Sequence, residues 1–68
     1  MLEICQFGAG RIGAIHAANV AARPDARLRY VVDVNREAAA ALATKHGARV
    51  VDVDAALADP AVGAVIVA

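Results

Sequence analysis

Gly8-Ala9-Gly10-Arg11-Ile12-Gly13 is the stretch that decides the fold of this chain. It lies between a strand-length apolar run, residues 2–7, and a helical run without breakers, residues 11–22. In such a turn the first glycine permits a tight bend, the second admits a diphosphate to bare backbone, and the third lets the helix pack closely on the strand. The helix N-terminus adds unpaired N–H groups and partial positive charge. The stretch therefore predicts a diphosphate-binding turn.

An acidic residue follows at the spacing that such a turn requires. Asp33 ends a second apolar run, residues 28–32, and stands about 20 residues beyond the last glycine, where a carboxylate would bind the adenosine ribose. The carboxylate would accept hydrogen bonds from the ribose hydroxyls and repel a 2′-phosphate, which favours NAD over NADP. Arg36 could offset that repulsion, or cover the adenine face as a solvated arginine.

Composition excludes several classes of protein. The chain has 68 residues, 60% of them hydrophobic, and a formal net charge of zero, which indicates one small globular unit without a basic stripe for nucleic acid. No apolar run approaches the roughly 18 residues of a membrane span. The only cysteine, Cys5, lies in the first strand, where a buried, unreactive thiol is expected. With no basic leader, these features favour a cytoplasmic location.

The rest of the chain alternates helical and strand-like segments. The first helix, residues 11–22, should bury a stripe of small side chains: Gly13, Ala17, Val20 and Ala21. The second strand should begin half-solvated at Arg27 and Arg29, with Tyr30 as a packing residue. A second helix should follow Asn35 as N-cap and end near His46 at Gly47.

The last third of the chain predicts three short elements. These are a strand at residues 48–51, a helix at residues 55–58 capped by Asp52 or Asp54, and a strand within residues 62–68. Val65-Ile66-Val67 fits a parallel strand that is covered on both faces. Right-handed crossovers then give a βαβαβαβ chain with strand order 3-2-1-4, which is an α/β, Rossmann-type parallel sheet.

The final strand would leave an open sheet edge, which invites pairing. We therefore expect residues 1–68 to be a partial NAD(P)-binding domain, the N-terminal part of a longer two-domain chain whose substrate domain is absent, and to fold poorly alone. No Ser/His/Asp cluster, paired carboxylates or Cys/His metal spacing is present, so no catalytic or metal residue is predicted. His16 and Asn19 could face a substrate cleft, but a structural role is favoured.

Four segments together resemble the Gfo/Idh/MocA oxidoreductase family, over the whole chain. They are residues 7–13, residues 15–19, residues 32–35, and Asp59-Pro60 shortly before residues 65–68. Members of that family are NAD(P)-dependent enzymes that oxidise a sugar or cyclitol hydroxyl to a ketone, and the nearest likeness is to those that oxidise inositol. The resemblance implies that the Lys, Asp and His that handle the substrate lie beyond Ala68, so the segment alone should be inactive. It also implies a homo-oligomer at full length.

The resemblance also assigns cofactor-binding residues. Gly8, Gly10 and Gly13 would shape the turn, while Arg11 and Ile12 would offer backbone N–H groups to the pyrophosphate. Asp33 would bind the adenosine ribose, with Asn35 and Arg36 beside it, and Ala68 would lie near the nicotinamide. The chain departs from many relatives at Ala14, where a long basic residue is common.

Three functions remain open at this point. The leading one is hydride transfer from a polyol carbon, with myo-inositol as the expected substrate, to NAD. The second is a non-catalytic nucleotide-binding sensor or subunit. The third is a dehydrogenase of the same family that acts on another sugar, an amino-sugar or a tetrapyrrole.

Overall fold

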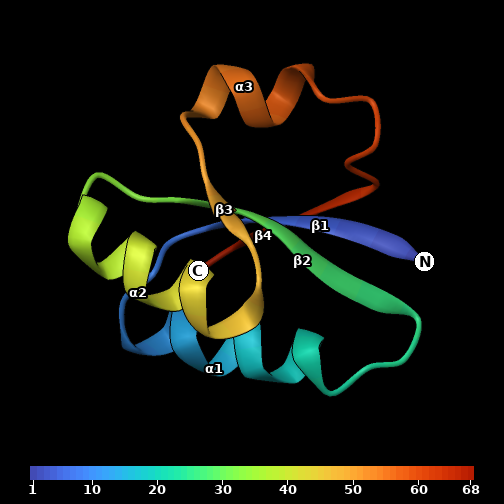
Figure 1. Cartoon of the computed structure of the whole chain (residues 1–68), viewed down its shortest axis with the longest axis horizontal. Coiled ribbons are helices and arrows are strands. Elements are labelled where there is room, and N and C mark those ends of the chain that lie inside the picture. The colour runs from blue at the N-terminus through green and yellow to red at the C-terminus, as the bar shows by residue number, and fades with distance from the viewer.

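The structure, a computed structural model, describes all residues from 1 to 68. Its four strands are parallel and form one sheet in the order β3-β2-β1-β4, as predicted. Helices α1 and α2 lie on one face of the sheet and α3 on the other (Figure 1). The elements in chain order are β1 (Leu2–Phe7), α1 (Arg11–Ala21), β2 (Ala26–Val32), α2 (Arg36–His46), β3 (Arg49–Val50), α3 (Val53–Ala58) and β4 (Ala64–Val67). The Rossmann-type fold is therefore confirmed.

Capping residues set the ends of α2 and α3. The Asn35 side chain accepts a hydrogen bond from the Ala38 N–H at 3.1 Å, and Gly47 ends α2 in the left-handed region at φ 69°. Asp52 caps α3 through the Ala55 N–H at 2.8 Å, so this helix begins earlier than the predicted residue 55. No helix has the length and apolar character to cross a membrane.

The core lies between the sheet and the helices α1 and α2. Alanine supplies much of the helical surface there, which lets both helices approach the sheet closely. Of the predicted stripe on α1, Gly13, Ala17 and Val20 are buried, but Ala21 is exposed. One residue turns an α-helix by about 100°, so Ala21 points away from the face that carries Val20. The buried apolar set is Ile4, Ala17, Val20, Ala26, Leu28, Val31, Ala39, Leu42 and Ala43.

The two edge strands differ from their predicted extent or environment. β3 has only two residues, Arg49 and Val50, opposite Tyr30 and Val31, instead of the predicted residues 48–51. In β4 the predicted cover on both faces is wrong for this chain, because Val65 is 50% and Val67 81% exposed. The helix on that face, α3, packs mainly against β2, so it leaves this side of β4 open.

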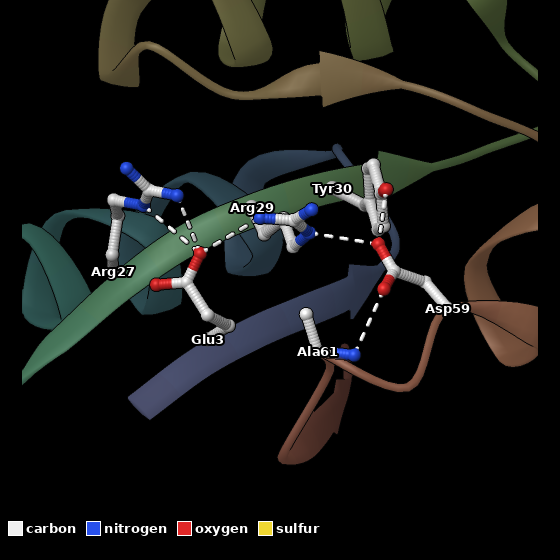
Figure 2. Close-up of polar contacts among 6 residues, drawn as sticks. All are labelled: Glu3, Arg27, Arg29, Tyr30, Asp59 and Ala61. Carbon is white, nitrogen blue, oxygen red and sulfur yellow. Dashed lines mark hydrogen bonds and ion pairs between the residues drawn. The ribbon is translucent and has the colours of Figure 1, made fainter. Parts of the chain in front are cut away.

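A bulge in the β1–β2 ladder gathers a polar cluster on the α3 face of the sheet (Figure 2). Ile4 pairs with Leu28 and Cys5 with Tyr30, which leaves Arg29 as the extra residue. Both Arg29 and the Tyr30 hydroxyl donate hydrogen bonds to the same oxygen, Oδ2, of Asp59. Tyr30 was predicted as a packing residue, and its hydroxyl adds a structural task, because it ties β2 to the segment after α3.

Glu3 completes this cluster from β1. Its Oε1 accepts hydrogen bonds from Arg27 and, at 3.1 Å, from Nη1 of Arg29 (Figure 2). The guanidinium of Arg29 thus bridges Glu3 and Asp59, and its side chain is only 30% exposed. The predicted half-solvated entry to β2 is consequently an ion-pair network that joins β1, β2 and the loop before β4.

Acid should weaken this network. The pKa of Asp59 is lowered from 3.8 to about 2, mainly by the Tyr30 hydroxyl, then by the Ala61 N–H and by Arg29. A carboxyl whose pKa is lower in the folded state stabilises the fold above its unfolded-state pKa and loses that contribution as pH falls through the folded-state pKa. We expect Asp59→Asn to lower the free energy of unfolding in urea at about pH 6, and this loss to shrink between about pH 4 and pH 2.

Asp54→Asn is the matched control, because Asp54 lies in α3 and contacts neither arginine nor tyrosine. Its effect near neutral pH should be smaller than that of Asp59→Asn. Equal losses for the two variants would contradict the assigned role of Asp59.

Candidate functional site

The glycine-rich turn lies where three strands end. Gly8 donates its N–H to the Val32 carbonyl of β2 at 2.9 Å, and Ala68, just after β4, donates its N–H to Phe7 of β1 at 2.9 Å. Gly8 adopts φ 113°, and a Cβ there would lie 2.8 Å from the Ala68 carbonyl oxygen. A residue with a side chain at position 8 would therefore be strained and would also collide with the end of β4.

The other two glycines of the motif have opposite surroundings. A Cβ at Gly13 would overlap the carbonyl oxygen of Gly8, because α1 begins directly against the turn. A Cβ at Gly10 would meet nothing within 4 Å. Gly13 is thus required by packing inside the chain, whereas the absence of a side chain at Gly10 keeps open a space that the chain itself does not fill.

The start of α1 presents unpaired backbone donors beside that space. The first hydrogen bond of the helix runs from the Ala14 N–H to the Gly10 carbonyl at 2.9 Å, so the N–H groups of residues 10–13 have no acceptor within the chain. Gly10, the N-cap, has no side chain to accept from them, and no acidic residue lies in the first turn. These donors and the positive end of the helix dipole fit an anion such as a diphosphate.

Asp33 lies beside the turn and has a structural task that the sequence did not predict. Its Oδ2 accepts the Ala9 N–H at 2.7 Å, and its Oδ1 accepts the Asn35 N–H at 2.9 Å. These N–H groups, that of Asn35 first, hold the pKa of the Asp33 carboxyl below its ordinary value. Each oxygen of a carboxylate can accept two hydrogen bonds, so both retain capacity for ribose hydroxyls.

A hollow of about 180 Å³ adjoins Asp33 at the ends of β2 and β3. Asp33 and Arg36 both line it, together with the fully exposed side chain of Val34. Asp33 and Arg36, both predicted on the adenosine side, therefore line one hollow. Its apolar lining suits a flat ring such as adenine. Asn35 differs, because its side-chain oxygen is used to cap α2.

Gln6 is the residue of this region that sequence reasoning missed. Its side chain is completely buried in β1, and its Nε2 donates to the carbonyl oxygens of Gly13 at 2.7 Å and Gly8 at 2.9 Å. The available signal was a polar residue inside an apolar strand, two positions before the first glycine of the motif. A buried amide there requires a partner, and the nearest unpaired groups are those of the turn.

The other residues with reactive or polar side chains, His16, Asn19 and Cys5, do not form a second site. His16 is half-buried and Asn19 exposed, and neither side chain makes a hydrogen bond in the chain. Cys5 is completely buried, as predicted, and burial raises the pKa of its thiol. No three His, Cys, Asp or Glu side chains lie close enough together to hold a metal ion.

Comparison with known proteins identifies relatives of this chain. The model of the oxidoreductase family GFO_IDH_MocA, described as having an NAD-binding Rossmann fold, matches residues 2–68. An inositol 2-dehydrogenase of Rhizobium meliloti (strain 1021) is 43% identical over 61 residues, which make up 90% of this chain and 18% of that protein. The chain therefore spans about a fifth of the length of the curated relative it matches.

Two solved structures show the same arrangement. GenD2 from gentamicin A biosynthesis, solved in complex with NAD, superposes with a TM-score of 0.95 at 43% identity, over 98% of this chain and 20% of that one. The myo-inositol dehydrogenase of Lactobacillus casei, solved with NAD(H) and myo-inositol, superposes with a TM-score of 0.91 at 28% identity, over 100% of this chain and 21% of that one.

The two glycines should respond differently to alanine. Gly13→Ala should lower the free energy of unfolding by about 1–3 kcal/mol, because the new methyl group overlaps the Gly8 carbonyl. Gly10→Ala should change it by less than about 0.5 kcal/mol, since the methyl group enters open space at an ordinary φ of −76°. Urea denaturation followed by circular dichroism measures both. A Gly10→Ala variant as unstable as Gly13→Ala would contradict the assigned geometry.

Proposed function

Because the chain belongs to the Gfo/Idh/MocA oxidoreductase family, we propose that residues 1–68 bind NAD across the carboxyl ends of β1 and β2. The observation that carries the proposal is the set of unpaired N–H groups at residues 10–13, which lies beside the space left open by Gly10. The diphosphate accepts hydrogen bonds from these groups, among them those of Arg11 and Ile12. This binding needs no lysine or bound metal.

Asp33 and its surroundings bind the adenosine half. The free acceptor sites of the Asp33 carboxylate take the ribose hydroxyls, and the adenine lies in the hollow lined by Val34 and Arg36. Asn35 contributes by holding the start of α2 in place, and Ala68 lies against Gly8 on the side from which the nicotinamide half extends. When bound, NAD supplies the group that accepts the hydride.

Asp33 also makes NAD the preferred dinucleotide. Its low pKa keeps the carboxylate charged at neutral pH, and that charge repels the 2′-phosphate of NADP. Arg36 lines the same hollow and would favour a phosphate. The carboxylate prevails because two backbone N–H groups fix it in place, whereas the exposed Arg36 side chain makes no ion pair or hydrogen bond in the chain.

Asp33→Ser should shift preference toward NADP. We expect the ratio of the Kd for NADP to the Kd for NAD to fall by about tenfold or more, because the repulsive charge is removed. Both affinities should also weaken, since the hydrogen bond from Ala9 is lost. Asp33→Asn separates the two effects, because it removes the charge but keeps an acceptor oxygen. Isothermal titration calorimetry gives both constants, and an unchanged ratio in both variants would contradict the ribose role.

We further propose that the protein is an NAD-dependent dehydrogenase that removes a hydride from a polyol or sugar hydroxyl carbon, with myo-inositol as substrate and the 2-keto compound as product. The relatives that are inositol dehydrogenases support this substrate. Residues 1–68 supply the dinucleotide site and no group placed for proton transfer, so the groups that handle the substrate are assigned to a second domain, as is homo-oligomer assembly. The second candidate is a dehydrogenase for another sugar. It is supported by the equal identity, 43%, to GenD2, which belongs to gentamicin A biosynthesis and was solved with NAD.

A chimera tests the place of this segment in hydride transfer. Residues 1–68 would replace the matching part of the Rhizobium meliloti inositol 2-dehydrogenase, and NAD reduction would be followed with myo-inositol. We expect turnover in the chimera, and weaker NAD binding when it carries Gly10→Ala. A folded chimera that binds NAD but does not turn over would favour a non-catalytic nucleotide-binding subunit instead.

Gly10→Ala should weaken NAD binding to the chimera by about tenfold or more without unfolding it. The added methyl group occupies the space where the diphosphate approaches the backbone. The measurement is calorimetric titration with NAD, with circular dichroism as the check on folding. An affinity equal to that of the unaltered chimera would place the dinucleotide elsewhere.

A further inference from the structure

Gln6 is a completely buried polar residue beneath the proposed diphosphate site. Both hydrogens of its amide nitrogen are used, one on the Gly8 carbonyl and one on the Gly13 carbonyl. The amide thereby joins the first and last glycines of the turn. We propose that Gln6 is a positioning residue that holds this turn in the conformation that binds a dinucleotide diphosphate, an inference that rests on the proposed NAD site.

The Gly8–Ala9 peptide group shows how the positioning works. Its carbonyl oxygen accepts from no backbone N–H, so Gln6 is its hydrogen-bond partner within the chain. Its N–H donates to Oδ2 of Asp33 at 2.7 Å. One peptide plane is therefore held at both ends by side chains, from β1 and from the end of β2. Fixing this plane fixes the direction in which the following N–H groups, those of residues 10–13, point.

The stability of the fold does not by itself explain why position 6 carries an amide side chain. The Oε1 of Gln6 is buried and has no partner in the chain, so the residue carries the cost of one unpaired polar atom. Methionine, unbranched and of similar length, would fill the same space without that cost, although it would leave the Gly8 carbonyl without a donor. In Gln6→Met, removal of the unpaired Oε1 raises stability and loss of the donor to the Gly8 carbonyl lowers it. Only the loss of the two donated hydrogen bonds changes how the turn is held.

The test introduces each variant into the chimera with the Rhizobium meliloti inositol 2-dehydrogenase and titrates the purified protein with NAD by calorimetry. Gln6→Met should weaken binding by about tenfold at little change in unfolding midpoint. Gln6→Glu places a carboxylate against two carbonyl oxygens, and only its protonated form can donate to one of them. The Kd of this variant, relative to that of the unaltered chimera, should therefore fall between about pH 8 and pH 5, a dependence that Gln6→Met should lack.

Val20→Ala is the control for a general loss of stability, because Val20 is buried in α1 away from the turn. It should lower the unfolding midpoint and leave the Kd for NAD within about twofold, at temperatures where all variants are folded. Unchanged NAD binding in Gln6→Met, or an equal loss in Val20→Ala, would overturn the inference about Gln6 alone. Failure of the folded, unaltered chimera to bind NAD would overturn the proposed function together with it.

Discussion

The close approach of α1 to the end of β1 is the constraint on which the site depends. It is possible only because position 13 has no side chain, since a Cβ there would overlap the Gly8 carbonyl. With the helix this close, its N-terminal N–H groups lie beside the ends of β1, β2 and β4, and no residue of the chain pairs with them. Packing inside the molecule thus generates an unsatisfied, positively polarised surface. That surface is what a diphosphate can use, and the NAD proposal follows from it.

Two side chains turn this constraint into a defined geometry. Gln6 holds the carbonyl of the Gly8–Ala9 peptide from beneath the turn, and Asp33 holds its N–H from the end of β2. Asp33 therefore has two tasks, because the carboxylate assigned to the ribose also fixes the turn assigned to the diphosphate. This coupling joins the two halves of the proposed dinucleotide site through one peptide group. It also explains why a charged residue is compatible with its partly buried position, since backbone donors stabilise the charge.

The sequence predicted most of the fold because its signals are local. Glycine positions, the Asn35 cap, Gly47 and the apolar runs each determine a nearby element, and the order 3-2-1-4 follows from right-handed crossovers. What it missed depends on register and tertiary contact. The bulge at Arg29 could not be read from the chain, so the hydrogen bond from Tyr30 to Asp59 was not expected. Gln6 was passed over for the same reason, because its partners are backbone carbonyls that only the folded turn brings into reach.

The most direct test of the dinucleotide site is a titration of the ¹⁵N-labelled chimera with NAD, followed by two-dimensional NMR of the backbone amides. The unpaired N–H groups of residues 10–13 should show the largest shifts, with smaller shifts at Asp33 and Arg36 around the hollow that they line. Saturation should occur at one equivalent. Shifts that leave residues 10–13 unchanged, or that centre on the other side of the sheet around Arg27 and Arg49, would contradict the account.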